Sequence, residues 1–234
     1  MDGKIIINEL EPMSSRSREA YNSLRTNLQF CGADLKTILF TSCTPNEGKS
    51  TVTFDLARSM AESGKRVVLV DADLRKSVMV SRYKLSTTKQ RLKGMAHFLS
   101  KQADAKEIVN GTNIPNLYIV LTGPLTPNPT ELLNGTTFKE LLVYLKANFD
   151  AVIIDSPPLG NVIDAAVMAP FCDGVVLVIS CDNISYRLAA DVKKQLEMAE
   201  CRILGTVLNK VDASKGKYYY KYYGDYYGTY GEEK

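Results

Sequence analysis

Residues 42–51 read SCTPNEGKST and contain the groups that a phosphate-binding loop needs. Gly48 lets the backbone close on a phosphate, and the N–H groups around it can face the anion. Lys49 can span the β- and γ-phosphates of a nucleotide, and the Ser50 hydroxyl is placed to bind Mg²⁺. An apolar run precedes the loop and an amphipathic stretch follows it, which is the strand–loop–helix order that the chemistry requires. The segment therefore predicts a nucleotide-phosphate site.

The loop departs from the common phosphate-binding motif at its first position. G-x-x-x-x-G-K-[ST] has glycine where this chain has Cys43, and Pro45 stiffens the backbone two residues later. The alternative interpretation is a chance Gly-Lys-Ser sequence before a surface helix. The strand and helix on either side favour nucleotide binding, and we expect these loop residues at the nucleotide: Thr44, Pro45, Asn46, Glu47, Gly48, Lys49, Ser50 and Thr51.

Three aspartates at the ends of two predicted strands can complete a phosphoryl-transfer site. Asp71 and Asp73 follow the apolar run VVLV, and Asp155 follows AVII. Residues two apart in a strand share a side, so Asp71 and Asp73 reach one side of the carboxyl edge of the sheet. Mg²⁺ prefers oxygen ligands, which Ser50 and the aspartates supply, while one aspartate can orient or deprotonate an acceptor hydroxyl. A lone aspartate at a strand end can be structural, but this combination with Lys49 predicts catalysis.

The sequence Asn209-Lys210-Val211-Asp212 resembles the guanine-reading motif of small GTPases. Those proteins place a glycine three residues after the aspartate that corresponds to Asp155, whereas this chain continues Ser-Pro-Pro. We interpret Asn209 as a base contact for either ATP or GTP, with ATP favoured.

The composition is typical of one soluble globular domain. In 234 residues, 45% are hydrophobic and 24% are charged, and the formal net charge of +3 predicts neither nucleic-acid nor membrane binding. The five cysteines are odd in number and widely spaced, with no C-x-x-C, so we expect free thiols in a reducing cytoplasm. No apolar run reaches the roughly 18 residues of a membrane span and no secretory signal begins the chain, so any membrane attachment requires a partner.

Apolar, β-branched runs alternate with helical patterns along the chain. We expect helices at 14–30, 50–63, 136–148 and 185–199, and strands at 36–41, 66–71, 117–121, 151–155, 174–180 and 203–209. The strand runs are nearly continuous in apolar residues, which is typical of a parallel sheet covered on both faces. The predicted fold is α/β, with a P-loop and a doubly wound, mainly parallel sheet between two layers of helices.

The predicted first helix, which follows an extended lead-in at residues 1–12, has two faces. Its apolar face carries Ala20, Tyr21, Leu24 and Leu28. Its other face is either a solvated surface or a contact with another subunit, and it carries Arg16, Arg18, Glu19 and Arg25.

Residues 75–93 contain seven basic residues and no acidic residue. We expect either a solvated, mobile loop or a patch that faces phosphate or phosphotyrosine, formed by Arg75, Lys76, Arg82, Lys84, Lys89, Arg91 and Lys93. The single histidine, His97, is expected to be packed or exposed rather than a metal ligand.

The composition changes abruptly at residue 212. Residues 212–234 hold eight of the thirteen tyrosines among glycine and lysine, without aliphatic residues to build a core, namely Tyr218, Tyr219, Tyr220, Tyr222, Tyr223, Tyr226, Tyr227 and Tyr230. We predict a disordered, low-complexity tail after a domain at 1–211. The alternatives are a sticky aromatic tail and a stacking strip for single-stranded nucleic acid, but the formal charge of the tail is zero, which disfavours the latter.

Taken together, these motifs resemble those of the bacterial tyrosine kinases of capsule and exopolysaccharide synthesis, especially the separate cytoplasmic kinase subunit of Gram-positive bacteria. The loop at 42–51 is similar to that family's Walker A form, which contains proline and lacks the first glycine. DADLR, starting at Asp71, and IIDSPP, containing Asp155, are similar to its two aspartate motifs. Residues 19–30 resemble its first helix, and the tyrosine tail resembles its autophosphorylated cluster.

The resemblance implies a site and partners. Lys49 would bind the phosphates of ATP, Ser50 and Asp155 would bind Mg²⁺, and Asp73 would hold the metal through water. Asp71 would be the base for the tyrosine hydroxyl. A kinase of this size would be activated by the cytoplasmic tail of a transmembrane adaptor at the inner face of the membrane. It would form rings in which one tail enters the neighbouring site, and a phosphotyrosine phosphatase would reverse the modification.

The family's oligomerisation motif in the first helix is Glu-x-x-Arg-x-x-Arg, and this chain has Asn22 between Glu19 and Arg25.

Three other classes of protein compete with the autokinase. ATP-switch proteins of the partitioning and division-site type carry a lysine five residues before the loop lysine, where this chain has Thr44. A GTPase switch and a catalytically inactive domain with a binding tail are the remaining alternatives.

Overall fold

The structure, a computed structural model, describes residues 4–88, 92–181 and 183–211. The predicted tail, with its tyrosines and the boundary after residue 211, lies outside these residues, as do Lys89 and Arg91. In chain order the elements are β1 (Ile5–Ile6), α1 (Ser15–Phe30), β2 (Thr37–Ser42), α2 (Lys49–Glu62), β3 (Val67–Asp71), α3 (Met79–Arg82), β4 (Ser86–Thr87), α4 (Met95–Leu99), α5 (Ala105–Ile108), β5 (Val109–Gly111), β6 (Leu117–Val120), α6 (Pro129–Asn134), α7 (Thr136–Asn148), β7 (Ala151–Asp155), α8 (Asp164–Met168), η1 (Ala169–Phe171), β8 (Gly174–Ser180), α9 (Tyr186–Met198) and β9 (Ile203–Asn209).

A seven-stranded sheet forms the centre of the molecule, in the order β5-β6-β3-β7-β2-β8-β9. All neighbouring strands are parallel except the short edge strand β5, which runs antiparallel to β6. The predicted doubly wound sheet is confirmed, and the predicted strands and long helices are all present. The sequence did not indicate the two-stranded β1–β4 pair, because strands of two residues have no readable alternation.

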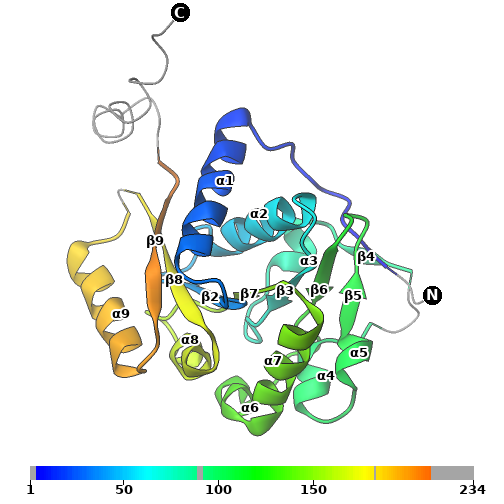
Figure 1. Cartoon of the computed structure of the whole chain (residues 1–234). Helices are drawn as coiled ribbons and strands as arrows, with labels where there is room; N and C mark the ends of the chain where they lie inside the picture. Colours follow the sequence, from blue (N-terminus) through cyan, green and yellow to red (C-terminus); the bar gives the residue numbers. More distant parts are fainter. Residues whose placement is uncertain (1–3, 89–91, 182, 212–234) are drawn as a thin grey trace, which may run out of the picture.

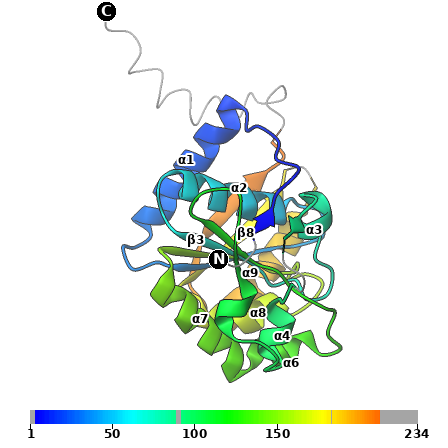
Figure 2. The same cartoon turned by 90° about the vertical axis from the view of Figure 1, so that its right-hand side faces the viewer.

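Helices cover both faces of the sheet (Figures 1 and 2). Within β3, Val67 and Leu69 pack on the side of α1 and α2, whereas Val68 and Val70 pack on the side of α7, α8 and α9. Successive side chains of a strand point to opposite faces, so a strand buried on both sides must be apolar throughout. The continuous apolar runs of the sequence are explained by this double burial.

Helix α1 lies on α2 at the upper side of the sheet in Figure 1. Ser14 caps it, because its Oγ accepts a hydrogen bond from the Ser17 N–H at 3.0 Å. The Tyr21 hydroxyl donates to Asp55 Oδ2 of α2 at 3.3 Å, and Leu28 is buried. Ala20 lies on the predicted face with Tyr21 and Leu24, where all three border one groove, although Ala20 itself is exposed.

The basic segment is more ordered than a mobile loop. It contains α3 and β4, and Met79 of α3 is 1% exposed within the core beneath α2. The expectation of a mobile loop was therefore wrong for this part, because a buried methionine and strand pairing with the lead-in hold the segment in place.

Two expectations about side chains can be compared with the described residues. None of the five cysteines forms a disulfide, which agrees with the predicted thiols. His97 caps its own short helix, since its Nδ1 accepts from the Gly94 N–H at 3.1 Å.

In the described part of the chain, no helix combines the length and apolar character needed to cross a membrane.

Candidate active site

The phosphate loop and the aspartates meet at the carboxyl edge of the sheet. The register pairs Asp71 of β3 with Asp155 of β7, and Asp155 with Phe40 of β2, so the three strands end together. A cavity of about 350 Å³ opens at this edge, where Gly48, Lys49, Ser50, Asp73 and Arg82 are among the residues that line it. Ligands in doubly wound folds bind at this edge, so the cavity is the candidate active site.

Gly48 occupies a position that only glycine can fill. Its φ is 89°, in the left-handed region, and it forms the N-cap of α2. A Cβ at this residue would also lie 2.1 Å from Asn209 Nδ2, so a side chain here would displace the Asn209 amide. The loop therefore brings its backbone N–H groups to the start of a fourteen-residue helix, where an anion is stabilised.

Lys49 and Asp155 form a buried ion pair beneath this loop. Lys49 Nζ lies 3.1 Å from Asp155 Oδ1 and 3.4 Å from Ser50 Oγ, and the Asp155 side chain is 3% exposed. Lys49 Nζ and Asp155 Oδ1 are close enough for an ion pair but are not aligned for a hydrogen bond. Asp155 Oδ1 therefore has no hydrogen-bond partner among the described residues. Burial raises the pKa of Asp155, and Lys49 opposes this.

These residues fit a magnesium ion. A buried carboxylate oxygen without a hydrogen bond, next to a serine hydroxyl at a helix N-terminus, is the donor set that Mg²⁺ takes when phosphate oxygens and water supply the rest. Residues 4–88, 92–181 and 183–211 contain no cluster of three or more histidine, cysteine, aspartate or glutamate residues that could hold a metal by itself. A metal here would therefore depend on the bound nucleotide.

Asp71 lies below the cavity in a buried position. It is 1% exposed, accepts a short hydrogen bond from the Ser77 hydroxyl, and accepts a longer one of 3.4 Å from the Asp73 N–H. Burial, followed by the nearby charge of Asp155, raises the pKa of Asp71 to about 8. A carboxyl with a pKa close to neutrality is suited to exchange a proton with a substrate hydroxyl.

Asp73 lines the cavity, unlike Asp71. Its Oδ1 accepts from the backbone N–H groups of Arg75 at 3.2 Å and of Lys76 at 2.9 Å. This local turn fixes the carboxyl group at the mouth of the site, where it can reach a metal or its water ligands.

A further buried carboxylate, which the sequence did not single out, anchors the same loop. Asp164 of α8 is fully buried and receives Arg75 Nε at 2.7 Å and Nη2 at 3.0 Å. The Thr130 hydroxyl of α6 also donates to Asp164, at 2.6 Å. The forked guanidinium joins the loops after β3, β6 and β7. The position of Arg75 two residues after Asp73 was the only sequence signal for this network.

The basic segment divides between the two predicted roles. Arg75, Lys76 and Arg82 line the cavity, which supports the phosphate-facing interpretation for these three. Lys84 instead pairs with Glu9 at 3.2 Å and Lys93 with Glu107 at 2.6 Å, both near the surface.

The predicted nucleotide residues are not all at the cavity. Pro45, Asn46, Glu47 and Gly48 line it together with Lys49 and Ser50, but Thr44, Thr51 and Asn209 do not. Thr51 Oγ1 accepts from Arg82 Nη1 at 2.9 Å, so this hydroxyl is directed at α3. Thr44 bonds within the loop, through its N–H and its hydroxyl to Glu47 Oε1.

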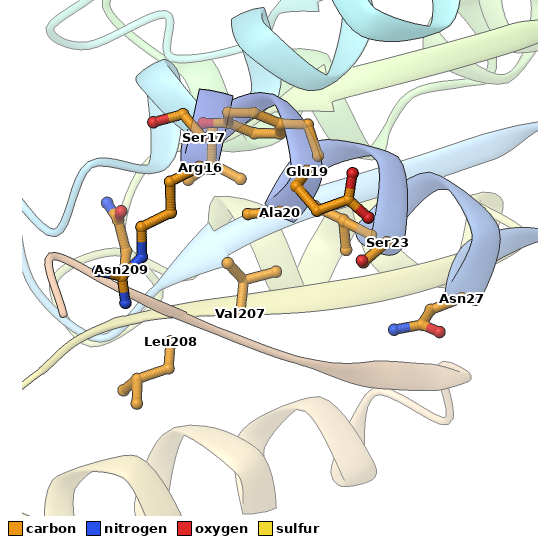
Figure 3. A pocket seen from close by; sticks show the side chains of 12 residues that line it. Arg16, Ser17, Glu19, Ala20, Ser23, Asn27, Val207, Leu208 and Asn209 are labelled. Atoms are coloured by element: carbon orange, nitrogen blue, oxygen red, sulfur yellow. The ribbon is translucent and has the colours of Figure 1, made fainter. Parts of the chain in front are cut away.

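Asn209 holds the phosphate loop from the end of β9. Its Nδ2 donates to the Glu47 carbonyl oxygen at 2.8 Å, and Lys210 Nζ donates to the Asn46 carbonyl oxygen at 2.5 Å. The Asn-Lys sequence therefore bonds to the loop backbone. Asn209 also borders a separate groove of about 630 Å³, where side chains of α1 face those of β9 (Figure 3).

The two residues predicted for oligomerisation differ in their surroundings. Glu19 is exposed and borders the α1–β9 groove in Figure 3. Arg25 is half-buried, and its Nη1 donates to the Ser59 carbonyl oxygen of α2 at 3.1 Å. Within a single chain, Arg25 thus also fixes α1 on α2.

Comparisons with known proteins agree with this geometry. The family described as AAA domain matches residues 36–204. Tyrosine-protein kinase CpsD of Streptococcus agalactiae is 40% identical over 205 residues, which is 88% of each protein. Tyrosine-protein kinase YwqD of Bacillus subtilis (strain 168) is 38% identical over 216 residues, 92% of this chain and 89% of that protein. The solved BceF tyrosine kinase domain has a TM-score of 0.75 at 34% identity and covers 84% of this chain and 78% of that one.

The fold and the loop define a P-loop nucleotide-binding domain of the AAA kind. With relatives of 38% and 40% identity that cover most of its length, the chain belongs to the family of bacterial tyrosine-protein kinases. The resemblance drawn from the sequence motifs is confirmed.

Proposed function

We propose that the protein is an ATP- and Mg²⁺-dependent tyrosine autokinase that phosphorylates its own C-terminal tyrosine cluster in trans, within an oligomer, and so regulates capsule or exopolysaccharide synthesis. One observation carries the proposal. Lys49, Ser50, Asp71, Asp73 and Asp155 converge at one sheet edge in a chain that is 40% identical to a tyrosine-protein kinase. Each of these residue types has a part in phosphoryl transfer.

On the nucleotide side, the backbone N–H groups around Gly48 receive the phosphates at the N-terminus of α2. Lys49 exchanges its contact with Asp155 for the phosphate oxygens, which frees the buried carboxylate. Ser50 and Asp155 would hold Mg²⁺, and Asp73 would contribute through water. When bound, the metal neutralises the charge that develops on the transferred phosphoryl group.

On the acceptor side, Asp71 takes the proton of the incoming tyrosine hydroxyl. Its raised pKa, close to 8, keeps the carboxyl basic enough for this transfer. Arg82 and Lys76 border the approach to the cavity and balance the negative charge of a tail that already carries phosphate. The acceptor tyrosines belong to residues 212–234, which continue from β9.

The partners follow from the family. We propose a transmembrane adaptor whose cytoplasmic tail stimulates the kinase, and a phosphotyrosine phosphatase that reverses the reaction. The protein would be cytoplasmic and recruited to the inner face of the membrane by the adaptor. A solved structure described as the chimerical protein CapA2B2 shares the fold, at 29% identity and a TM-score of 0.78. A ring-like homo-oligomer through Glu19 and Arg25 completes the proposal.

The test is the intact mass of the purified full chain after incubation with Mg²⁺ and ATP, with GTP in parallel. We expect successive additions of one phosphate, which disappear in Lys49→Ala and in a variant with all eight tail tyrosines changed to phenylalanine. Nucleotide hydrolysis without any phosphate addition, with or without the adaptor tail, would instead support the ATP-switch class.

A further inference from the structure

Glu47 is a fully buried charged side chain within the phosphate loop. We infer that its role is to position the loop for nucleotide binding, by tying the loop backbone to the ends of β8 and β9, and that its carboxyl group never touches the nucleotide. This inference rests on the nucleotide-binding part of the proposed function. It does not depend on which group accepts the phosphate.

Three donors converge on the Glu47 carboxyl group. Oε1 accepts from the Thr44 N–H at 2.5 Å and the Thr44 hydroxyl at 3.2 Å. Oε2 accepts from the Ser180 N–H, at the end of β8, at 2.9 Å. Both oxygens are therefore used as acceptors inside the protein, and although Glu47 borders the cavity, its side chain has no exposed surface. A buried charge is tolerated only when it is hydrogen-bonded in this way.

The backbone of the same residue is fixed from a second strand. The Glu47 carbonyl oxygen accepts from Asn209 Nδ2 at the end of β9, at 2.8 Å. The strand order places β8 next to β2 and β9 beyond β8, so Glu47 connects the loop to two successive strand ends. Gly48, directly after it, adopts its left-handed φ of 89° against that Asn209 amide.

This arrangement compensates for the missing first glycine of the motif. Cys43 takes that position, is fully buried and has no left-handed φ, so the turn there is made without glycine's conformational freedom. The hydrogen bonds from Thr44 to the Glu47 side chain close the turn. The hydrogen bond from the Ser180 N–H positions the turn relative to the end of β8. A loop whose N–H groups are already aimed at the phosphates binds them at a lower entropic cost.

Glu47→Gln tests the inference, because it keeps the shape but replaces one acceptor oxygen with an NH₂ donor. One of the donors from Thr44 or Ser180 then faces another donor and is left unsatisfied. We expect the Kd for Mg²⁺–ATP, from calorimetry, to rise about ten- to a hundredfold, while kcat at saturating ATP falls less than about threefold. Amide hydrogen exchange should accelerate at least about tenfold at residues 43–48 and stay within about twofold at β7.

Two further variants complete the experiment on the full chain. Glu62→Gln removes the exposed acidic partner of an i,i+4 pair with Arg58 at the far end of α2 and should leave binding and exchange unchanged. Thr44→Val removes only the hydroxyl donor and should weaken binding about threefold, which gives a result even if Glu47→Gln does not fold.

Binding within about twofold of the wild type in both loop variants would overturn the inference. Equal acceleration of exchange in β7 would also overturn it, because Glu47 would then serve the whole fold. Failure of the kinase proposal alone would leave nucleotide binding and exchange measurable.

Discussion

The catalytic edge has two halves that are anchored in different ways. The phosphate half, residues 42–51, is held by bonds from Asn209 and Lys210 to its backbone oxygens and by the bond from the Ser180 N–H to the Glu47 carboxyl group. The carboxylate half, residues 71–77, is held by side chains, with Ser77 on Asp71 and the Arg75 fork on Asp164. The difference suggests that the phosphate half controls nucleotide affinity, whereas the carboxylate half controls transfer to the acceptor.

Substitution of Asp71 should separate the halves most clearly. Asp71→Asn removes the base but keeps a similar shape against Ser77, so we expect kcat to fall about 10²- to 10⁴-fold with little change in ATP affinity. Single-turnover transfer to the tail, beside ATP binding by calorimetry, measures both quantities. A comparable loss of ATP affinity would contradict the division of roles.

Substitution of Lys49 should affect the phosphate half. Lys49→Met removes the charge that faces the phosphates and leaves Asp155 without its ion-pair partner, so we expect kcat/KM to fall about 10²- to 10³-fold. Unlike Asp71→Asn, this variant should also weaken nucleotide binding. Steady-state kinetics at varied ATP checks the prediction, and an unchanged KM with only kcat reduced would argue against it.

The Arg75–Asp164 network should contribute mainly to the stability of the carboxylate half. Asp164→Asn breaks the forked pair in a fully buried position, although Arg75 can still reach water, so we expect a loss of about 2 kcal/mol in unfolding free energy. For a chain of this length that lowers Tm by roughly 4–8 °C. Glu197→Gln, which removes an exposed helical pair with Lys193, is the matched control and should change stability by less than about 0.5 kcal/mol.

Asp173 provides a control at the opposite edge of the sheet. Burial raises its pKa, but hydrogen bonds from Lys146 and from the N–H groups of Thr37 and Lys36 outweigh this and lower the pKa to about 2. A lowered pKa stabilises the folded state above the unfolded value of 3.8, and this contribution is lost as the pH falls towards 2. Asp173→Ala should therefore cost about 1–2 kcal/mol at pH 7, with the difference from wild type shrinking below pH 4. Urea titrations across this range check it, and ATP affinity should not change.

Much of the fold was predictable because each signal was local. The runs VVLV before Asp71 and AVII before Asp155 are apolar on both faces, and this alone placed them in the middle of a covered parallel sheet. Gly48 and Lys49 were identified because a contiguous motif carries its own chemistry. The meeting of Asp71 with Asp155 at one edge followed from the fold class, whereas the order of the strands was not predicted.

The remaining features depend on contacts between residues far apart in the chain. Nothing local indicates that Asp164 receives Arg75 across 89 positions, or that Ser180 bonds to Glu47 across 133. Asn209 was expected at the nucleotide base, but its amide bonds to the loop backbone. Short strands such as β4 leave no periodic pattern, which is why the basic segment was expected to be a loop.

The central claim is that the catalytic edge of one chain transfers phosphate to the tail of another. The direct measurement mixes two full-length variants with Mg²⁺ and ATP: Lys49→Met, which keeps all tail tyrosines, and a chain with the eight tail tyrosines changed to phenylalanine, which keeps the site. Intact mass distinguishes the two. We predict that phosphate appears on the Lys49→Met chain only when the second variant is present, and that Asp71→Asn in the second variant abolishes it. An unmodified Lys49→Met chain, under conditions in which the wild-type protein phosphorylates itself, would contradict transfer in trans.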